Sequence, residues 1–327
     1  MEKVKMAFLG AGGISEKMAL TIAKMPDVEA YAVAARDLDR AKDFAARHGF
    51  KKAYGSYKEM VEDPSVELVS VATPHSHHLE HSMLCLDHGK HVLCEKAFTV
   101  NAKQAKKLLD YAKEKKLLIT EAIWTRYMPL SKKINEVLDS GIIGTPKLLT
   151  ANLGYPISRV ARIIEPGLAG GALLDLSVYP INFASMVFGD KVERVSSSAL
   201  MTDKGVDATN SITMFFGQDR TAVMYSTIFM QTNREGIIYG DKGHIAVENI
   251  NNPDYFRVFT ADFKEIARYD APERISGYEY EVQSAVKAIK EGRLECPEMP
   301  HRETLRIMEL LDDIRSSWGM KFPFEKD

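Results

Sequence analysis

A short glycine-rich stretch close to the N-terminus, VKMAFLGAGGIS at residues 4–15, constrains the fold of this chain more than any other. Residues 4–9 are mostly apolar and favour a β-strand, and residues 15–25 place apolar side chains at helical spacing. A strand, a glycine turn and a helix in this order begin a dinucleotide-binding βαβ unit. Ser15 replaces the third glycine of the G-x-G-x-x-G pattern, and its small side chain still permits close packing of helix against strand. The alternative interpretation is an ordinary tight turn.

The residues of this turn have physical reasons to contact a dinucleotide. Gly10 allows the tight turn, and Gly12 leaves room for a pyrophosphate to approach the backbone. The helix that follows offers unpaired N–H groups and a partial positive charge to the phosphates. We therefore predict a loop of cofactor-binding residues, which comprises Gly10, Ala11, Gly12, Gly13 and Ile14.

Strands and helices alternate through the first part of the chain. The predicted strands are residues 4–9, 30–35, 52–54, 66–72, 91–94 and 118–121. This alternation predicts a parallel, doubly wound sheet, whose ligands bind beyond the carboxyl ends of the strands. Those ends and the helix starts beside them carry the remaining predicted cofactor-binding residues, which are Arg36, Thr73, Pro74, His75, His78, Glu95 and Lys96.

The pattern changes after Trp124 and becomes rich in predicted strands, interrupted by a helix over residues 173–188. It predicts an α+β domain around a large, open, mostly antiparallel sheet. We predict a dinucleotide-binding Rossmann domain over residues 1–122 and a domain for substrate binding and dimerisation over residues 123–327. An open sheet needs its outer face covered, and pairing of subunits is one common way to cover it.

The composition excludes several other classes of protein. A chain of 327 residues is too long for one small core, and a formal net charge of −2 indicates no basic surface for nucleic acid. The three cysteines are not in C-x-x-C spacing and are typical of reduced thiols in a cytoplasmic protein. Met1 leads directly into a predicted strand, so we expect no signal peptide, and we expect no membrane span because no apolar run is long enough.

The end of the second predicted strand indicates which nicotinamide cofactor binds. Enzymes that use NAD usually place an acidic residue there for the ribose hydroxyls, but this chain has Ala35 followed by Arg36. A guanidinium binds a 2′-phosphate that a carboxylate would repel, so the sequence favours NADP. In the alternative interpretation Arg36 is a solvated surface residue, Asp37 binds the ribose, and NAD is the cofactor.

Several motifs are similar to those of the Gfo/Idh/MocA oxidoreductases, among them GAGGIS, VATPHSHH, GKHVLCEKA, GGALLDLSVYP and IIYGDKGHIAVEN. The resemblance covers essentially the whole chain. Within the family, EAIWTRYMP and Tyr179 most resemble the NADP-dependent dimeric dihydrodiol dehydrogenases, also called D-xylose 1-dehydrogenases. The resemblance implies hydride transfer between NAD(P) and a carbon of a sugar, polyol or cyclic trans-diol. It also implies homodimers that form through the C-terminal sheet.

The chain departs from the family pattern at three places. The family motif EKP reads Glu95-Lys96-Ala97, so the proline that normally fixes the backbone after the lysine is absent. The common motif D-x-G-x-H begins at Asp175 and ends at Tyr179, a substitution known in one subfamily. His75 stands where the family usually has an asparagine, which would alter the contact with the nicotinamide.

Three residues have the chemistry for hydride transfer at an alcohol carbon, which needs a proton acceptor and a positive centre near the oxygen. The Lys96 ammonium would polarise the substrate oxygen and assist Tyr179, because the ordinary pKa of a phenol is about 10. On the sequence alone it stays open which of the two residues transfers the proton. Asp175 lies four residues before Tyr179, on the same face of the predicted helix, and would orient substrate hydroxyls. The structural alternatives are an ion pair of Lys96 with Glu95, a core tyrosine, and a helix-start carboxylate.

Second-line candidates for substrate contact are Trp124, Arg126, Tyr155 and Arg162, each of which has an equally plain structural interpretation. We expect no metal site, because the histidines of residues 75–81 have no cysteine or carboxylate at matching spacing. Two other functions remain open on the sequence alone. One is a non-catalytic sensor that binds NADP, and the other is a reductase of the same fold with a non-sugar substrate.

Overall fold

The computed structural model describes residues 3–325, which fall into two compact units. The first unit comprises the described residues up to Trp124 together with Arg274–Met308, and the second comprises Thr125–Glu273 and the described residues from Glu309 onwards. This division differs from the predicted one, which gave residues 274–308 to the second domain. Residues 274–308 join the first unit through contacts between residues distant in the sequence, such as the stack of the Trp124 ring on Tyr278, with centroids 4.1 Å apart.

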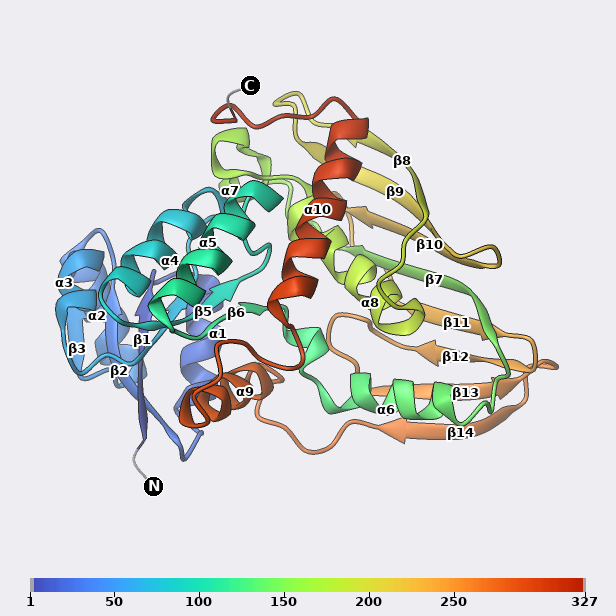
Figure 1. Cartoon of the computed structure of the whole chain (residues 1–327), viewed down its shortest axis with the longest axis horizontal. Helices are drawn as coiled ribbons and strands as arrows, with labels where there is room; N and C mark the ends of the chain where they lie inside the picture. The colour runs from blue at the N-terminus through green and yellow to red at the C-terminus, as the bar shows by residue number, and fades with distance from the viewer. Residues whose placement is uncertain (1–2, 326–327) are drawn as a thin grey trace. The chain divides into compact units, whose positions relative to one another are not determined.

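The first unit contains a six-stranded sheet in the order β3-β2-β1-β4-β5-β6, with every pair parallel (Figure 1). The strands are β1 (Val4–Leu9), β2 (Val28–Ala34), β3 (Lys52–Tyr54), β4 (Leu68–Val71), β5 (His91–Glu95) and β6 (Ile119–Ala122). The strand order reverses between β1 and β4, and ligands of such sheets bind beyond the carboxyl ends of the strands at this point.

Helices connect these strands and pack on the sheet. They are α1 (Gly13–Ile22), α2 (Leu38–His48), α3 (Tyr57–Glu62), the short η1 (His75–His77), α4 (His78–Asp87), α5 (Ala102–Lys115) and α9 (Glu279–Lys290). The last helix, α10 (His301–Ser317), begins in the first unit and ends in the second. Local sequence explains several ends: Asp37 caps α2, Asn101 caps α5, and Gly49 ends α2 in the left-handed conformation.

The second unit contains an eight-stranded sheet in the order β14-β13-β12-β11-β7-β10-β9-β8. All neighbours are antiparallel except β7 and β10, which run parallel. The strands are β7 (Pro146–Gly154), β8 (Arg194–Met201), β9 (Asp207–Phe216), β10 (Arg220–Thr227), β11 (Gly236–Gly240), β12 (Gly243–Val247), β13 (Tyr255–Thr260) and β14 (Glu265–Asp270). The predicted fold class, a Rossmann sheet followed by a large, mostly antiparallel sheet, is confirmed.

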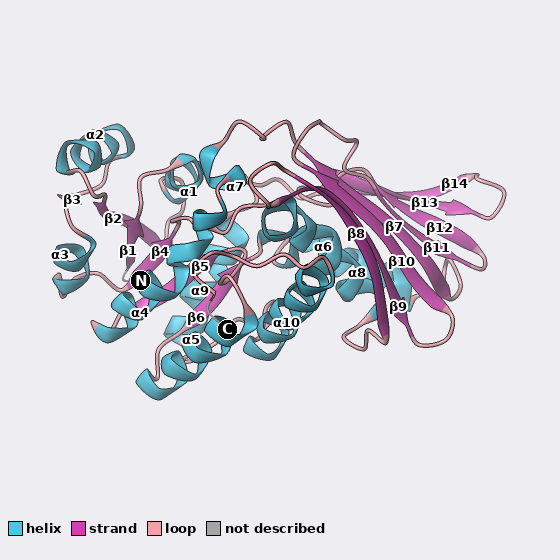
Figure 2. Ribbon diagram, turned by 90° about the horizontal axis from the view of Figure 1, so that it is seen from above, coloured by secondary structure: helices cyan, strands magenta, loops and turns pink. Residues whose placement is uncertain are grey.

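One face of this second sheet packs on helices. The helical segments of the region are η2 (Trp124–Arg126), α6 (Pro129–Asp139), α7 (Ala161–Ile164), η3 (Pro166–Leu168), the π-helical turn η4 (Leu173–Ser177) and α8 (Val178–Phe188). Figure 2 shows α6 and α8 on one face of the sheet, and no helix of the described chain lies over the other face. Along β10, Ala222 and Met224 are buried whereas Val223 and Tyr225 are exposed, which is the alternation of a sheet covered on one side.

The segment Pro166–Phe188 is long and apolar enough, by length and composition alone, to cross a membrane. The sequence analysis found no such run. In the structure 83% of its most apolar window is buried inside the protein, as in the core helix of a globular domain.

Candidate active site

The glycine turn after β1 needs its first glycine for two reasons. Gly10 adopts a φ of +111°, and a Cβ at this position would lie 3.3 Å from the Ala72 carbonyl oxygen at the end of β4. The Ser15 hydroxyl donates a 2.7 Å hydrogen bond to the Gly10 carbonyl. Ser15 therefore ties the first turn of α1 to the glycine turn as well as permitting close packing.

The next two glycines leave open space over the backbone. A Cβ at Gly12 or Gly13 would meet no atom of the described chain within 4 Å. Gly12 is also the N-cap of α1 and supplies no side chain to the first-turn N–H groups. The turn therefore fits a pyrophosphate, which would approach Gly12 and Gly13 and receive hydrogen bonds from the start of α1.

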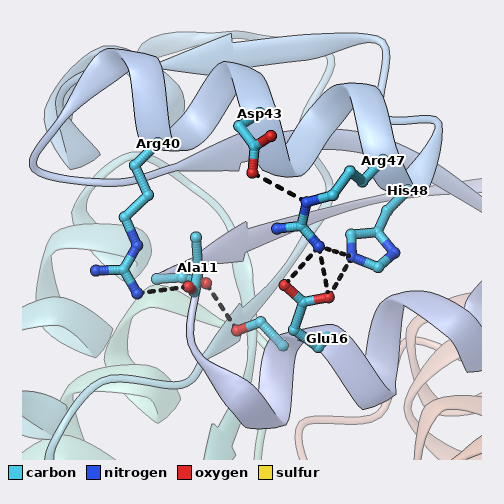
Figure 3. A network of polar contacts seen from close by, with 8 residues as sticks. Ala11, Glu16, Arg40, Asp43, Arg47 and His48 are labelled. Atoms are coloured by element: carbon cyan, nitrogen blue, oxygen red, sulfur yellow. Dashed lines mark hydrogen bonds and ion pairs between the residues drawn. The ribbon is translucent and has the colours of Figure 1, made fainter.

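Two arginines lie at the edge of this turn. Arg36 is exposed just beyond β2, and Arg40 in the first turn of α2 donates a 2.7 Å hydrogen bond to the Ala11 carbonyl (Figure 3). Asp37 caps α2, because its Oδ1 accepts the Arg40 N–H at 3.0 Å. That bond engages the carboxylate which the alternative interpretation assigned to the ribose of NAD.

Arg40 was not among the predicted residues, although the sequence places this second arginine four residues after Arg36, at the start of the next predicted helix.

A carboxylate close to the same turn is already neutralised. Glu16 in the first turn of α1 pairs with Arg47, 2.8 Å away, and with His48 (Figure 3). Burial acts in the opposite direction, but the hydrogen bonds from Arg47 and His48 lower the pKa of Glu16. The negative charge of Glu16 is therefore neutralised by residues of α2.

An aromatic and histidine cluster lies next to Arg36. The Tyr57 and His81 rings meet edge to face at 4.8 Å, and His81 Nδ1 lies 3.0 Å from the Thr73 hydroxyl. Burial raises the pKa of Tyr57, and the charges of Arg36 and Arg40 oppose that rise. Burial, together with the neighbouring His77, lowers the pKa of His81 to about 4, so this histidine is neutral at physiological pH. Tyr57 and His81 had no local sequence signal, because only the fold brings them to Arg36.

The ends of β4 and β5 meet through His78. This histidine is fully buried, with Nδ1 2.9 Å from the Ala97 carbonyl oxygen and Nε2 2.8 Å from that of Thr73. Burial lowers the pKa of His78 to about 4, and a neutral ring can donate to one of these carbonyls at a time. His78 thus holds the segment that follows Lys96 against the end of β4.

Other predicted residues lie at this same edge. His75 is buried and meets His78 edge to face at 5.6 Å. Pro74 precedes η1, and Glu95 ends β5. The Lys96–Ala97 peptide bond is cis, and the Phe98 N–H donates to the buried Glu121 carboxylate at 3.2 Å. The first unit therefore brings the predicted cofactor-binding residues to the carboxyl edge of its sheet.

A second set of predicted residues gathers in the second unit. Arg162 and Asp175 form a 2.8 Å ion pair in which the Asp175 side chain is 5% exposed. Tyr155 and Tyr179 both pack against one apolar cluster, made up of Leu153, Ile163, Ala172, Leu176, Ala208 and Ile228. The ion pair offers hydrogen-bonding groups for hydroxyls, and the partly buried tyrosine rings offer apolar surface for a ring.

The segment that carries Asp175 differs from the regular helix predicted over residues 173–188. Residues 173–177 form the π-helical turn η4, and α8 begins only at Val178. The i to i+4 geometry of an α-helix, which placed Asp175 and Tyr179 on one face, therefore does not describe this turn.

The two remaining candidates have structural contacts. Trp124 is 7% exposed and stacks on Tyr278, and Arg126 donates from Nε to the Asn182 side-chain oxygen at 2.5 Å. Residues 3–325 contain no group of three or more His, Cys, Asp or Glu side chains that could hold a metal ion.

A parallel sheet in the order 3-2-1-4-5-6, with an open glycine turn at its switch point, defines a dinucleotide-binding protein of the Rossmann type. Comparisons with known proteins identify the family. Residues 4–122 match "Oxidoreductase family, NAD-binding Rossmann fold", and residues 131–246 match "GFO/IDH/MocA C-terminal domain". The chain belongs to the GFO/IDH/MocA family of oxidoreductases, as its motifs indicated.

Individual relatives extend this comparison over the full length. Human trans-1,2-dihydrobenzene-1,2-diol dehydrogenase is 33% identical over 331 residues, which cover 99% of each chain. A 3-ketoreductase from Actinomadura kijaniata, solved with NADP and TDP-benzene, has a TM-score of 0.89 and 25% identity and covers 96% of this chain and 98% of its own. Levoglucosan dehydrogenase, solved with NADH and levoglucosan, shares the fold with a TM-score of 0.85 and 20% identity, over 97% of both chains.

These similarities, with the open glycine turn, make the chain a dehydrogenase that uses a nicotinamide dinucleotide.

Proposed function

We propose that this enzyme transfers hydride between NADP and a CH–OH carbon of a cyclic trans-diol, a sugar or a polyol. The full-length similarity to trans-1,2-dihydrobenzene-1,2-diol dehydrogenases carries this proposal. The tyrosine faces and the Arg162–Asp175 ion pair of the second unit support it, because a ring that bears hydroxyl groups needs both an apolar surface and hydrogen-bond partners.

The residues of the first unit would hold the cofactor. Gly12, Gly13 and the start of α1 would bind the pyrophosphate, and Arg36 and Arg40 would bind the 2′-phosphate that distinguishes NADP from NAD. Capping of α2 by Asp37 supports NADP, because one oxygen of that carboxylate already accepts the Arg40 N–H. When bound, the nicotinamide supplies the hydride or takes it up.

The chain would supply the proton chemistry through two residues. In the oxidation direction, Tyr179 as the phenolate accepts the proton of the substrate hydroxyl at its oxygen while the carbon loses hydride. The Lys96 ammonium lowers the energy of the phenolate and of the developing carbonyl oxygen by its positive charge. The Asp175 carboxylate accepts a hydrogen bond from a second substrate hydroxyl and holds the ring in place, with Arg162 fixing its orientation.

Steady-state kinetics of single variants test these roles. Tyr179→Phe removes only the hydroxyl, so kcat should fall about 100-fold or more while NADP affinity stays at the wild-type value. Lys96→Met should lower kcat by a similar factor, because the charge that stabilises the phenolate is lost. Lys103→Met, which removes an exposed lysine of α5, is the matched control and should turn over like the wild type. Wild-type turnover in Tyr179→Phe would contradict the assignment of the proton transfer.

We also propose that two subunits pair through the uncovered face of the eight-stranded sheet. On β10, Val223 is 43% and Tyr225 is 47% exposed. Leu148 of β7 is 39% exposed and lies on the same face, because the strand register pairs it with Thr221. A row of exposed apolar side chains on a regular sheet is typical of a protein–protein interface.

A further inference from the structure

Side chains of one strand of the second unit form hydrogen bonds with both ends of the turn that carries Asp175. Asp207 is the first residue of β9, and its Oδ2 accepts the Leu173 N–H at 2.8 Å, at the start of η4. At the other end of η4, the Ser177 hydroxyl donates to the Asn210 side-chain oxygen at 2.9 Å. The two ends are linked to each other, because the Asn210 amide nitrogen donates to Asp207 Oδ2 at 2.8 Å.

All members of this chain of hydrogen bonds are buried. Asp207 and Ser177 are 0% exposed, and Asn210 is 1% exposed. Hydrogen bonds at such positions fix geometry, since water cannot replace them when they break. The five-residue turn between these two hydrogen bonds contains Asp175, and Tyr179 lies two residues after the end of the turn.

The close contact between Asp207 and the segment before η4 requires a glycine at position 171. A Cβ at Gly171 would lie 2.2 Å from Asp207 Oδ1, and Gly171 adopts a φ of +116° that favours glycine. The Gly171 N–H donates to the Ile163 carbonyl at 2.8 Å, which fixes the peptide just before the turn. The carboxylate therefore occupies a gap that only glycine leaves open.

We propose that Asp207 and Asn210 are positioning residues, which clamp the π-helical turn η4 and so set the places of Asp175 and Tyr179. A π-helical turn is not the conformation that an isolated helix prefers, and such turns are frequent at functional sites. The clamp explains how the chain maintains one here: it binds the first and the last residue of the turn from a neighbouring strand. This proposal rests on the proposed function, in which Asp175 and Tyr179 contact the substrate.

The kinetics of three variants test the clamp. Asp207→Ala leaves the Leu173 N–H and the Asn210 amide without their acceptor, so kcat should fall on the order of 100-fold, as when catalytic groups shift by about 1 Å. Asp207→Asn keeps an oxygen where Oδ2 lies and should recover most of that loss. Dinucleotide affinity should stay at the wild-type value in both, because no clamp residue belongs to the first unit. If Asp207→Ala does not fold, Ser177→Ala is the substitute. It removes the hydrogen bond to Asn210 at the other end of the turn and should lower kcat by a smaller factor.

A matched control separates positioning from a general loss of stability. His244 in β12 is 8% exposed and stacks on Phe259, far along the sheet order from β9. His244→Ala should lower the melting temperature and leave kcat per folded molecule unchanged. The clamp is contradicted if Asp207→Ala turns over like the wild type, if Asp207→Asn is as inactive as Asp207→Ala, or if His244→Ala loses kcat equally.

The pH profile gives a second readout that a purely structural role would not change. Burial raises the pKa of Asp207 to about 6, and the groups that contact its carboxyl, the Leu173 and Asn210 amides and the Gly171 backbone, do not titrate. The protonated carboxyl is a neutral, weaker acceptor like the amide of Asp207→Asn, so wild-type kcat should decline below about pH 6 to about the level of that variant. Asp207→Asn should lack this decline, and an identical acid limb in both proteins would contradict the proposal.

The two proposals fail in different ways. Full turnover of Tyr179→Phe with loss of turnover in Asp207→Ala contradicts the proposed role of Tyr179 in proton transfer and supports a clamp that serves Asp175 or other groups. Full turnover of Asp207→Ala with loss in Tyr179→Phe contradicts the clamp and supports the proposed function.

Discussion

Charge at single residues decides which dinucleotide the first unit prefers. Arg36 and Arg40 lie beside the glycine turn, and the nearest carboxylates are engaged: Asp37 caps α2 and Glu16 pairs with Arg47. A 2′-phosphate would therefore meet two guanidinium groups, while each of the two nearest carboxylates already has a hydrogen-bond or ion-pair partner.

This arrangement predicts the effect of removing the arginines. Arg36→Ala and Arg40→Ala should each raise the Kd of NADP about 10- to 100-fold, since a hydrogen bond to a charged group contributes about 1.5–3 kcal/mol. The Kd of NAD should change much less. Fluorescence titration with both reduced dinucleotides measures the ratio.

Lys42→Ala provides the control on the same helix, because the Lys42 side chain is 62% exposed and pairs only loosely with Asp39, 3.9 Å away. It should leave the ratio of the two Kd values unchanged. Equal losses for NADP and NAD in Arg36→Ala would contradict the assignment of the 2′-phosphate site.

Local signals were enough to predict the places of some candidate residues and not of others. Arg36 follows directly from its place at the end of a strand, and Lys96 from its place at the end of β5. Tyr57 and His81 could not be predicted, because the edge-to-face contact between α3 and α4 exists only in the folded sheet. Asp207 could not be predicted for the same reason, since it lies 34 residues from Leu173, whose N–H it accepts.

At the scale of elements, a substitution at the start of α1 gives the most direct test of dinucleotide binding. Gly12 is in an extended conformation that any residue can adopt, and a Cβ there meets nothing within 4 Å. The chain itself therefore has no need of glycine at this position, but an approaching pyrophosphate does.

Gly12→Ala should thus leave the melting temperature close to the wild-type value and weaken NADP binding on the order of tenfold or more. Gly167→Ala is a suitable control, because a Cβ at Gly167 also meets nothing within 4 Å and lies outside the glycine turn. If NADP binds Gly12→Ala as tightly as the wild type, the pyrophosphate does not lie over this turn.

The elements themselves were largely predictable, because hydrophobic periodicity and glycine turns are local. The six strands of the first sheet fall close to their predicted ranges, while the helix over residues 173–188 begins as a π-helical turn. That departure depends on hydrogen bonds from β9, and the sequence around residue 173 contains no sign of which strand will lie beside it. The grouping of residues 274–308 with the first unit likewise depends on a long-range contact, the stack of Trp124 on Tyr278.

At the scale of the whole molecule, the uncovered sheet face predicts the state of assembly. The proposed interface places Val223 and Tyr225 near its centre, next to Leu148. Replacing both central residues, as Val223→Lys with Tyr225→Lys, should convert a dimer to monomers, because two lysines from each subunit would be buried without partners.

Sedimentation velocity measures this change. Leu20→Lys is the control, since Leu20 is 61% exposed on α1 and lies outside the sheet. A monomeric wild-type protein, or a double variant that remains dimeric, would contradict pairing through this face.

The central claim is that the enzyme moves hydride from a CH–OH carbon to a nicotinamide held by the first unit. The most direct measurement offers NADP and a cyclic trans-diol that carries deuterium at its hydroxyl-bearing carbons, and then examines the reduced dinucleotide by NMR. The account predicts deuterium on the nicotinamide ring with the wild-type enzyme and a large loss of rate with Tyr179→Phe. Tight binding of NADP without transfer of deuterium from this diol or from equally labelled aldoses and polyols would contradict it.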